Sequence, residues 1–500
     1  MQKKQTILVV ASLLVVILSV TLAYFTAQII GKEKDISVSS ADLKIIFTDG
    51  TDGSITSENT LPGWTTSKTF SVTNKSNATY EYNIVIEDLL NTFVTDGFLK
   101  YKITSDNDGY NMTDYENVPK SSEPTDTTLA YKVSIPVNVT QNYTVEFIYE
   151  NSSTVDQSAD MDKEFSGKLF ITEGTTPTFI EKLLLDNPTR LTRSDFSTVL
   201  TETNTKTLYK SEEDNKTVYY FAGQAQNNWL KFGKDSSNND LYWRIIRTNS
   251  DESIRLLYHG TSTTSTETYI GNSAYLTGNG YSAMNASYMY GTNDSLEKNR
   301  LNTNNSTIKL AIDTWYGTNL NNYTKYLSTT AIYCNDREIG SGEYCATCAN
   351  NFDYAAYTRL NTNKTPTYNC TNTSDKFTVD SSTGNGKLTY PIGLMTADEL
   401  QFAGGVYGTN NSAKTWYAIN SENEYSAGTN GWWTMTPEGW KQSVNATVSM
   451  VQSDGTFYGV TAIVSVGIRP VISIDKCAII KSGDGSPTNP YEIDYEGSKC

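Results

Sequence analysis

Strict alternation of apolar and polar side chains is the feature that most constrains the fold of this 500-residue chain. In the segments 80–87, 131–137 and 143–149, every second residue is aromatic or aliphatic, and the residues between are mostly polar. A period of two places the two sets on opposite faces of a β-strand, whereas a helix needs a period of about 3.6. Turn sequences at 48–50 and 107–109 separate such segments. Residues 31–173 are therefore predicted to form a β-sandwich of the jelly-roll type, with Pro136 on an edge strand.

The first 30 residues carry a targeting signal. Lys3 and Lys4 precede an apolar run that extends from Thr6 to about Ile30. A short basic segment followed by such a run is typical of an export signal, and its length approaches that of a membrane span. Two interpretations stay open, because the segment is either a signal peptide cleaved after Ala23 or a retained membrane anchor. Both predict that the rest of the chain lies outside the cytoplasm.

The charge balance argues against one large class of partner. Asp and Glu total 55 against 39 Lys and Arg, which gives a formal net charge of −16. Nucleic-acid binding needs basic patches that neutralise phosphates, and no basic stretch runs through the sequence, so no nucleic-acid partner is expected.

The single histidine, His259, limits the chemistry further. Metal sites and general bases built on histidine have this one candidate. His259 either serves as the base for a cysteine nucleophile or is a strand-end residue satisfied by local hydrogen bonds. No catalytic residue, metal site or cofactor is predicted.

Residues 208–476 mix strand and helix signals and are predicted to form an α+β domain with long polar loops. Runs of β-branched and aromatic residues at 217–221, 242–246, 253–257 and 467–474 predict strands. Ser306 is expected to cap one helix, and Thr396 with Glu399 fits the capping box of another, which Gly404 and Gly405 would end. Residues 174–207 are predicted as a linker with a short helix near 179–185.

The six cysteines all lie in the C-terminal half, at Cys334, Cys345, Cys348, Cys370, Cys477 and Cys500. Outside the cytoplasm they are expected to form disulfides. We favour a Cys334–Cys370 bridge around an inner Cys345–Cys348 bridge, although four cysteines allow three connectivities. Zinc binding or redox activity at the CxxC of Cys345 and Cys348 stays open as an alternative, but no second CxxC and no βαβ context accompanies it. Cys477 and Cys500 are predicted to staple residues 477–500 into a small hairpin.

Trp432, Trp433 and Trp440 are the candidate ligand-binding residues. Adjacent positions on a strand face opposite sides, so either Trp432 or Trp433 is expected to be exposed. An exposed indole can stack on a sugar ring or anchor a protein partner. The alternative is that these side chains fill the core. Acidic turns at 49–53 and 106–109 suggest calcium loops, but they lack the EF-hand spacing, and Asp and Gly also serve tight turns.

Three short segments in the N-terminal third carry a family resemblance. They are Leu22-Ala23-Tyr24-Phe25-Thr26, Ala41-Asp42-Leu43-Lys44-Ile45 and Phe70-Ser71-Val72-Thr73-Asn74. This part resembles the camelysin/TasA group of secreted biofilm-matrix proteins. The resemblance implies a jelly roll, a signal removed by a dedicated peptidase, and subunits that form fibres. The sequence lacks the zinc ligands of a metalloprotease, so the resemblance implies no peptidase activity.

Five stretches in the second half carry another resemblance. In chain order they cover residues 218–221, 242–247, 393–400, 432–437 and 467–471. They resemble a repeated surface-domain family of unknown function from low-GC Gram-positive bacteria. The Trp…Thr-x-Pro…Gly-x-Arg layout is more distantly similar to the C-type-lectin-like fold of formylglycine-generating enzymes. Those enzymes use a reactive cysteine pair near the C-terminal strands, whereas no cysteine lies between Cys370 and Cys477 here.

The expected function follows from these features. They predict an extracellular protein on the cell surface or in the matrix of a Gram-positive-type bacterium, with a structural or adhesive role and no enzymatic activity. The jelly roll would serve anchoring or fibre assembly, and the distal domain would serve recognition. The expected partners are other copies of the chain, a surface glycan or protein, and the membrane through the N-terminal segment. A lectin-like carbohydrate-binding module and a formylglycine-generating-type oxidase remain as alternatives.

Overall fold

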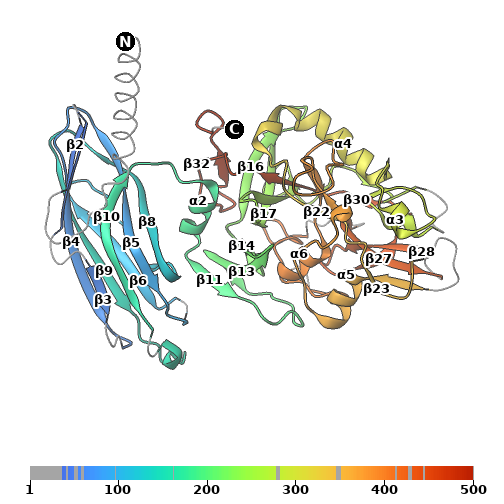
Figure 1. Cartoon of the computed structure of the whole chain (residues 1–500), viewed down its shortest axis with the longest axis horizontal. Coiled ribbons are helices and arrows are strands. Elements are labelled where there is room, and N and C mark those ends of the chain that lie inside the picture. Colours follow the sequence, from blue (N-terminus) through green and yellow to red (C-terminus); the bar gives the residue numbers. More distant parts are fainter. Residues whose placement is uncertain are drawn as a thin grey trace, which may run out of the picture.

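A computed structural model describes residues 36–40, 43–49, 54–57, 61–95, 97–160, 163–277, 282–344, 351–411, 414–425, 431–442, 445–498 and 500, with side chains from residue 61. The protein is mainly β, with several antiparallel sheets, as the alternation predicts (Figure 1). The predicted export segment 1–30, the turn at 50–53, and both Cys345 and Cys348 lie outside the described residues. No helix in the described ranges is long and apolar enough to span a membrane.

Two antiparallel sheets form the N-terminal unit, drawn mostly in blue in Figure 1. The six-stranded sheet has the order β1 (Ile36–Ser40), β2 (Leu43–Asp49), β4 (Thr65–Asn74), β9 (Thr140–Tyr149), β6 (Leu99–Asp106) and β7 (Glu116–Asn117). The four-stranded sheet has the order β3 (Ser54–Ser57), β10 (Phe165–Glu173), β5 (Tyr80–Asn91) and β8 (Ser121–Ile135). Pro136 directly follows β8, which is an edge strand.

The two sheets share one apolar core. Along β9, buried side chains alternate with more exposed ones, as a period of two requires. Ile103 and Phe147 from one sheet join Ile84 and Phe165 from the other in a single buried cluster. These residues make the unit a β-sandwich.

The segment after the sandwich is built onto the second unit. Thr178 and Glu181 form a capping box that begins α2 (Phe179–Asp186), so the short helix predicted here is confirmed. Phe179 and Leu183 are buried in the core of the second unit. Next, β11 (Thr189–Thr192) pairs in parallel with β13 (Thr207–Glu213). The predicted linker therefore includes a helix and a strand that belong to the second unit.

A ten-stranded sheet is the larger sheet of the second unit. Its main path is β11, β13, β14 (Lys216–Tyr220), β17 (Asp240–Thr248), β16 (Trp229–Lys234), β33 (Tyr491–Ile493) and β32 (Ile480–Ser482). From β17 the sheet continues through β18 (Ile254–Gly260) and β31 (Pro470–Ile474) to β26 (Ile392–Leu394). The tail hairpin β32–β33 is therefore part of this sheet.

A seven-stranded sheet lies beside the first. Its strands are β19 (Asn272–Ser273), β30 (Val466–Gly467), β27 (Trp432–Lys441), β24 (Phe352–Tyr354) and β23 (Ile339–Ser341), with β28 (Asn445–Val451) and β29 (Phe457–Thr461) added to β27. Three two-stranded ladders complete the strands: β12 (Thr203–Asn204) with β15 (Gln224–Ala225), β20 (Met289–Tyr290) with β21 (Asn304–Asn305), and β22 (Tyr333–Cys334) with β25 (Lys376–Phe377).

The helices begin where the sequence signals place them. Ser306 accepts a hydrogen bond from the backbone of Lys309 and caps α4 (Thr307–Asn319). Thr396 and Glu399 form the predicted capping box of α6 (Ala397–Phe402), and Gly404, with φ +116°, follows its end. The remaining helical segments are η1 (Ser158–Asp160), η2 (Ala283–Ala286), α3 (Leu296–Asn299), η3 (Asn321–Tyr326), α5 (Ala355–Tyr357), η4 (Thr358–Asn363) and η5 (Thr373–Asp375).

One continuous core joins both sheets of the second unit. Its largest fully buried side chains include the tryptophans 229, 243, 416, 432 and 433. They also include four arginines, at Arg244, Arg255, Arg337 and Arg469. Arginine is almost never fully buried without a partner, so these four positions indicate a candidate functional site.

Candidate functional site

A small hollow lies beside the Cys334–Cys370 disulfide. About 20 Å³ of it is accessible to the centre of a water molecule, which is room for about one water. Its lining is strongly charged, and its charged residues are Glu213, Arg247, Arg255, Asp336, Arg359, Asp398 and Glu399.

Local structure positions the charges on one side of this hollow. Arg247 and Arg255 lie on the neighbouring strands β17 and β18, which pair with each other. Glu213 ends β13. Glu399 lies in the first turn of α6, where the capping box fixes its side chain. Three segments far apart in the sequence thus bring their charges together.

Glu399 bridges the two arginines. Its Oε1 lies 3.0 Å from Nε of Arg247 and 2.7 Å from Nε of Arg255. Nη2 of Arg247 also donates to Oε1 of Glu213 at 2.8 Å. Burial opposes the charge on Arg247, but Glu213 and Glu399 outweigh it and raise the pKa of this guanidinium. Burial likewise acts to raise the pKa of Glu213, but the adjacent Arg247 holds that pKa below its usual value.

Arg359 ties the disulfide loop to α6. Its Nε and Nη2 each donate to Asp398 at 2.8 Å in a bidentate pair, and Nη1 donates to Asp336 at 3.1 Å. The backbone N–H of Thr367 donates to Asp398 as well. Burial raises the pKa of Asp336, and the opposing charge of Arg359 offsets this only in part.

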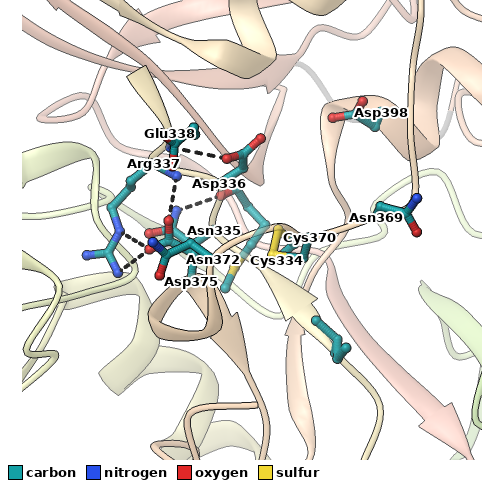
Figure 2. Close-up of a disulfide and its surroundings, with 12 residues drawn as sticks. Cys334, Asn335, Asp336, Arg337, Glu338, Asn369, Cys370, Asn372, Asp375 and Asp398 are labelled. Carbon is teal, nitrogen blue, oxygen red and sulfur yellow. Dashed lines mark hydrogen bonds and ion pairs between the residues drawn. A yellow bond between two sulfur atoms is a disulfide. The ribbon is translucent and has the colours of Figure 1, made fainter. Parts of the chain in front are cut away.

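A second charged group lies on the other side of the disulfide. Figure 2 shows Asp398 on one side of Cys334 and Cys370, and Arg337 with Asp375 on the other. Nε of Arg337 donates to Oδ1 of Asp375 at 2.8 Å. Arg300 donates to Oδ2 of the same carboxylate at 2.8 Å.

These ion pairs connect segments that are far apart in the sequence. The hollow is too small for a substrate, and the guanidiniums form charge-assisted bonds to fixed carboxylates. Removing one member of such a buried network leaves an uncompensated charge, so the network specifies how strand, helix and loop meet. In the described ranges, no three His, Cys, Asp or Glu side chains gather as ligands for a metal ion.

Two of the three predicted disulfides lie within the described residues, and both are present. Cys334 and Cys370, 36 residues apart, are bonded, and so are Cys477 and Cys500, 23 residues apart. Both pairings are as the sequence predicts. The predicted inner pair of Cys345 and Cys348 lies outside the described residues and stays a prediction.

The expectation that either Trp432 or Trp433 is exposed is wrong. Both side chains have 0% exposure, and Trp440 has 7%. The reason is that β27 is an interior strand of its sheet with packed side chains on both faces. Nε1 of Trp433 donates to the carbonyl of Ser273, and its ring packs edge-on against Tyr275. The alternative, that these tryptophans fill the core, describes their placement.

His259 lies on β18 with 0% exposure, edge-on against the ring of Trp229. The backbone of Thr263 is a hydrogen-bonding partner of this ring. Burial, together with the nearby Arg469 and Arg244, holds the pKa of His259 far below its usual value, although the backbone of Thr263 opposes this.

Sequence reasoning missed the charged network. The signal was present, because Arg247 and Arg255 interrupt strongly apolar strands, and an inward position on such a strand buries its side chain. Their partners Glu213 and Glu399 gave no comparable signal, since they are separated from Arg247 by 34 and 152 residues.

Comparisons with known proteins add no family. No protein-family model matches the chain, and no curated protein matches it. Among solved structures, Spo0M, a sporulation control protein from Bacillus subtilis, is similar at a TM-score of 0.12 and 9% sequence identity, over 44% of this chain and 80% of that one. A similarity this low indicates neither fold nor function.

Proposed function

We propose that this chain is an exported protein of the cell surface or extracellular matrix of a Gram-positive-type bacterium, with a structural or adhesive role. The observation that carries the proposal is the pair of disulfides, Cys334–Cys370 and Cys477–Cys500. Disulfides persist outside the reducing cytoplasm, where they stabilise proteins that must endure. The charged network around the first bridge supports the same reading, because it fixes a long loop onto the sheet.

In this proposal the sandwich is a jelly roll that assembles through an open sheet edge. Strand β1 pairs only with β2 in the described part of the chain. Its sequence, Ile-Ser-Val-Ser-Ser, contains neither proline nor a charged residue. Natural sheet edges are usually protected by such residues, and an unprotected edge is suited to pairing with another strand. The resemblance to fibre-forming matrix proteins points to the same use.

The assembly proposal is tested by electron microscopy across a range of protein concentrations. We expect polymers that grow with concentration for the full exported chain, and loss of polymers in Val38→Lys, because a lysine blunts a pairing edge. Val155→Lys is the matched control, since Val155 is 44% exposed outside the strands. Monomers at every concentration, or equal polymerisation of Val38→Lys, would refute this route of assembly.

Export is tested separately by counting free thiols on the protein from its native source. We expect a count near zero. A count near six would refute the disulfides and return attention to the oxidase alternative, which needs reduced cysteines.

One observation favours carbohydrate binding as a second candidate function. A hollow of about 500 Å³ lies over strands β4, β6 and β9 of the sandwich. Its polar lining includes Thr69, Thr104, Asp106, Asn142 and Thr144. Hydroxyl, amide and carboxylate groups form hydrogen bonds with sugar hydroxyls, and a few such groups in fixed positions orient the ligand. A glycan array should then show binding that Asn142→Ala weakens, and an array without any signal would remove this candidate.

A further inference from the structure

Two buried arginines in the second unit have no carboxylate partner among the residues that the structure describes. Arg244 on β17 and Arg469 just before β31 have 1% and 0% exposure. Arg244 donates to Oδ1 of Asn228 at 2.7 Å and to the carbonyls of Ala225 and Ile419 at 3.1 and 3.2 Å. Arg469 donates to the carbonyls of Tyr258 and Tyr417 at 3.1 and 2.7 Å. All these acceptors are neutral, so both positive charges remain unbalanced.

The other buried arginines of this unit do have carboxylate partners. Arg247, Arg255 and Arg337 each form an ion pair with a buried carboxylate. Within the described residues, neither Arg244 nor Arg469 forms one. Residues 412–413 and 426–430, which lie outside the described ranges, include no Asp or Glu. An unpaired buried charge costs several kcal/mol, so a counter-charge is expected here.

Unpartnered donors gather at the same place. Nη2 of Arg469 and Nε1 of Trp432 are buried without a hydrogen-bond partner among the described residues. The guanidinium of Arg469 lies 5.0 Å from the ring centroid of Trp432. The ring of Trp229 joins the rest, 4.0 Å from the guanidinium of Arg244 and 4.5 Å from the ring of His259.

The electrostatics agree with an excess of positive charge. Burial first, and then Arg469, holds the pKa of Arg244 well below its usual value. Burial lowers the pKa of Arg469 to about 9, so this guanidinium is still charged at neutral pH. Tyr269 acts in the opposite direction and raises the pKa of Arg469.

We propose that Arg244, Arg469 and Trp432 enclose a small monovalent anion such as chloride. The anion accepts hydrogen bonds from Nη2 of Arg469 and from Nε1 of Trp432. It also offsets the charge of the two guanidiniums. A small ion fits this set because the free donors are few and fully buried.

Bromide substitution tests the location of the ion. Crystals of the full exported chain grown in sodium bromide should show an anomalous scattering peak within hydrogen-bonding distance of Nη2 of Arg469. An absent peak overturns the proposal and leaves a water molecule, or contact between the side chains themselves, as the explanation.

Stability in chloride tests whether the ion matters. At fixed ionic strength and neutral pH, sodium chloride is exchanged for sodium gluconate, and the unfolding of the second unit is measured. Above the dissociation constant, each tenfold rise in chloride should raise the folding equilibrium constant about tenfold. Arg469→Met should abolish this dependence, and Lys476→Met, which removes an exposed charge, should keep it.

The bromide peak and the chloride dependence of stability together test the proposed anion site. If Arg469→Met fails to fold, the wild-type chloride dependence and the bromide peak still settle the proposal. A bromide peak without any chloride effect on wild-type stability marks an adventitious ion only and overturns it.

Discussion

The two units of this molecule specify their interiors in different ways. The sandwich contains no arginine, since the first arginine of the chain is Arg190. The ion pairs Lys100–Glu150 and Lys168–Asp88 of the sandwich lie near the surface. The second unit instead buries arginines in its core and balances three of them with carboxylates. Local alternation is enough to specify the first interior, whereas the second depends on charges that meet only when the topology is complete.

Asp160, a buried acid of the sandwich, is also stabilised without a guanidinium partner. Asp160 has 5% exposure, yet its oxygens accept hydrogen bonds from the backbone of Val94 and Thr95 and from the hydroxyl of Tyr149. Burial acts to raise the pKa of Asp160, but these hydrogen bonds prevail and lower it. Neutral donors thus suffice where the second unit uses guanidiniums.

The largest effect is expected from breaking the charged network. Glu399→Ala leaves Arg247 and Arg255 without their shared carboxylate, which should cost about 3–5 kcal/mol of stability. Urea unfolding followed by tryptophan fluorescence measures this, because Trp64 is the only one of the eight tryptophans that lies in the sandwich.

Lys168→Ala is the control for this experiment. It removes a surface ion pair with Asp88 and should change the stability of the sandwich by less than about 1 kcal/mol. A Glu399→Ala chain as stable as the wild type would show that the buried network contributes nothing and would remove the contrast between the units.

The next effect concerns the disulfide. Changing both Cys334 and Cys370 to serine opens a loop between residues 36 apart. Loop closure of this size contributes about 3–4 kcal/mol, so the second unit should unfold at lower urea. The sandwich contains no cysteine and should keep its own transition. Equal loss in both transitions would mean that the two units unfold as one.

The sequence predicted what local patterns determine. The alternation of 143–149 predicted β9, and the caps at Ser306 and Thr396 predicted α4 and α6, because capping residues lie within a few positions of the helix they begin. The Cys334–Cys370 pairing was also predicted, as one of three connectivities.

What depends on topology was not predicted. The contact of Glu399 with Arg247 joins residues 152 positions apart, and no local pattern contains it. The prediction that either Trp432 or Trp433 is exposed was wrong for the same reason. A period of two describes a strand with one solvent-exposed face, and β27 has no such face.

A third effect depends on pH. Glu438 is buried on β27, and burial raises its pKa to about 8, although the hydroxyls of Tyr407 and Ser449 partly offset this. A raised folded-state pKa means that the stabilising, protonated form is fully present below the unfolded value of about 4.3. Stability is then lost as pH rises from there through about 8.

Glu438→Gln tests this dependence, since glutamine cannot ionise. Relative to this variant, the wild-type second unit should lose up to about 1.4 kcal/mol per pH unit between those two values. Urea unfolding at a series of pH values measures the slope. Parallel curves for the two proteins would show that Glu438 titrates normally.

The smallest effect is expected from a neutral polar contact in the sandwich. The hydroxyl of Tyr82 donates to Oε1 of Gln141 at 2.7 Å and lies 2.5 Å from the hydroxyl of Tyr143. Tyr82→Phe removes one hydroxyl but keeps the ring, and Tyr143 still reaches Oε1 of Gln141 at 3.3 Å. No charge is left unpaired, so the cost should be about 1 kcal/mol. Urea unfolding followed by far-UV circular dichroism should place this loss in the sandwich transition alone. A loss as large as that of Glu399→Ala would show that both interiors depend equally on their polar contacts, and the contrast between an apolar and a charged core would no longer describe this molecule.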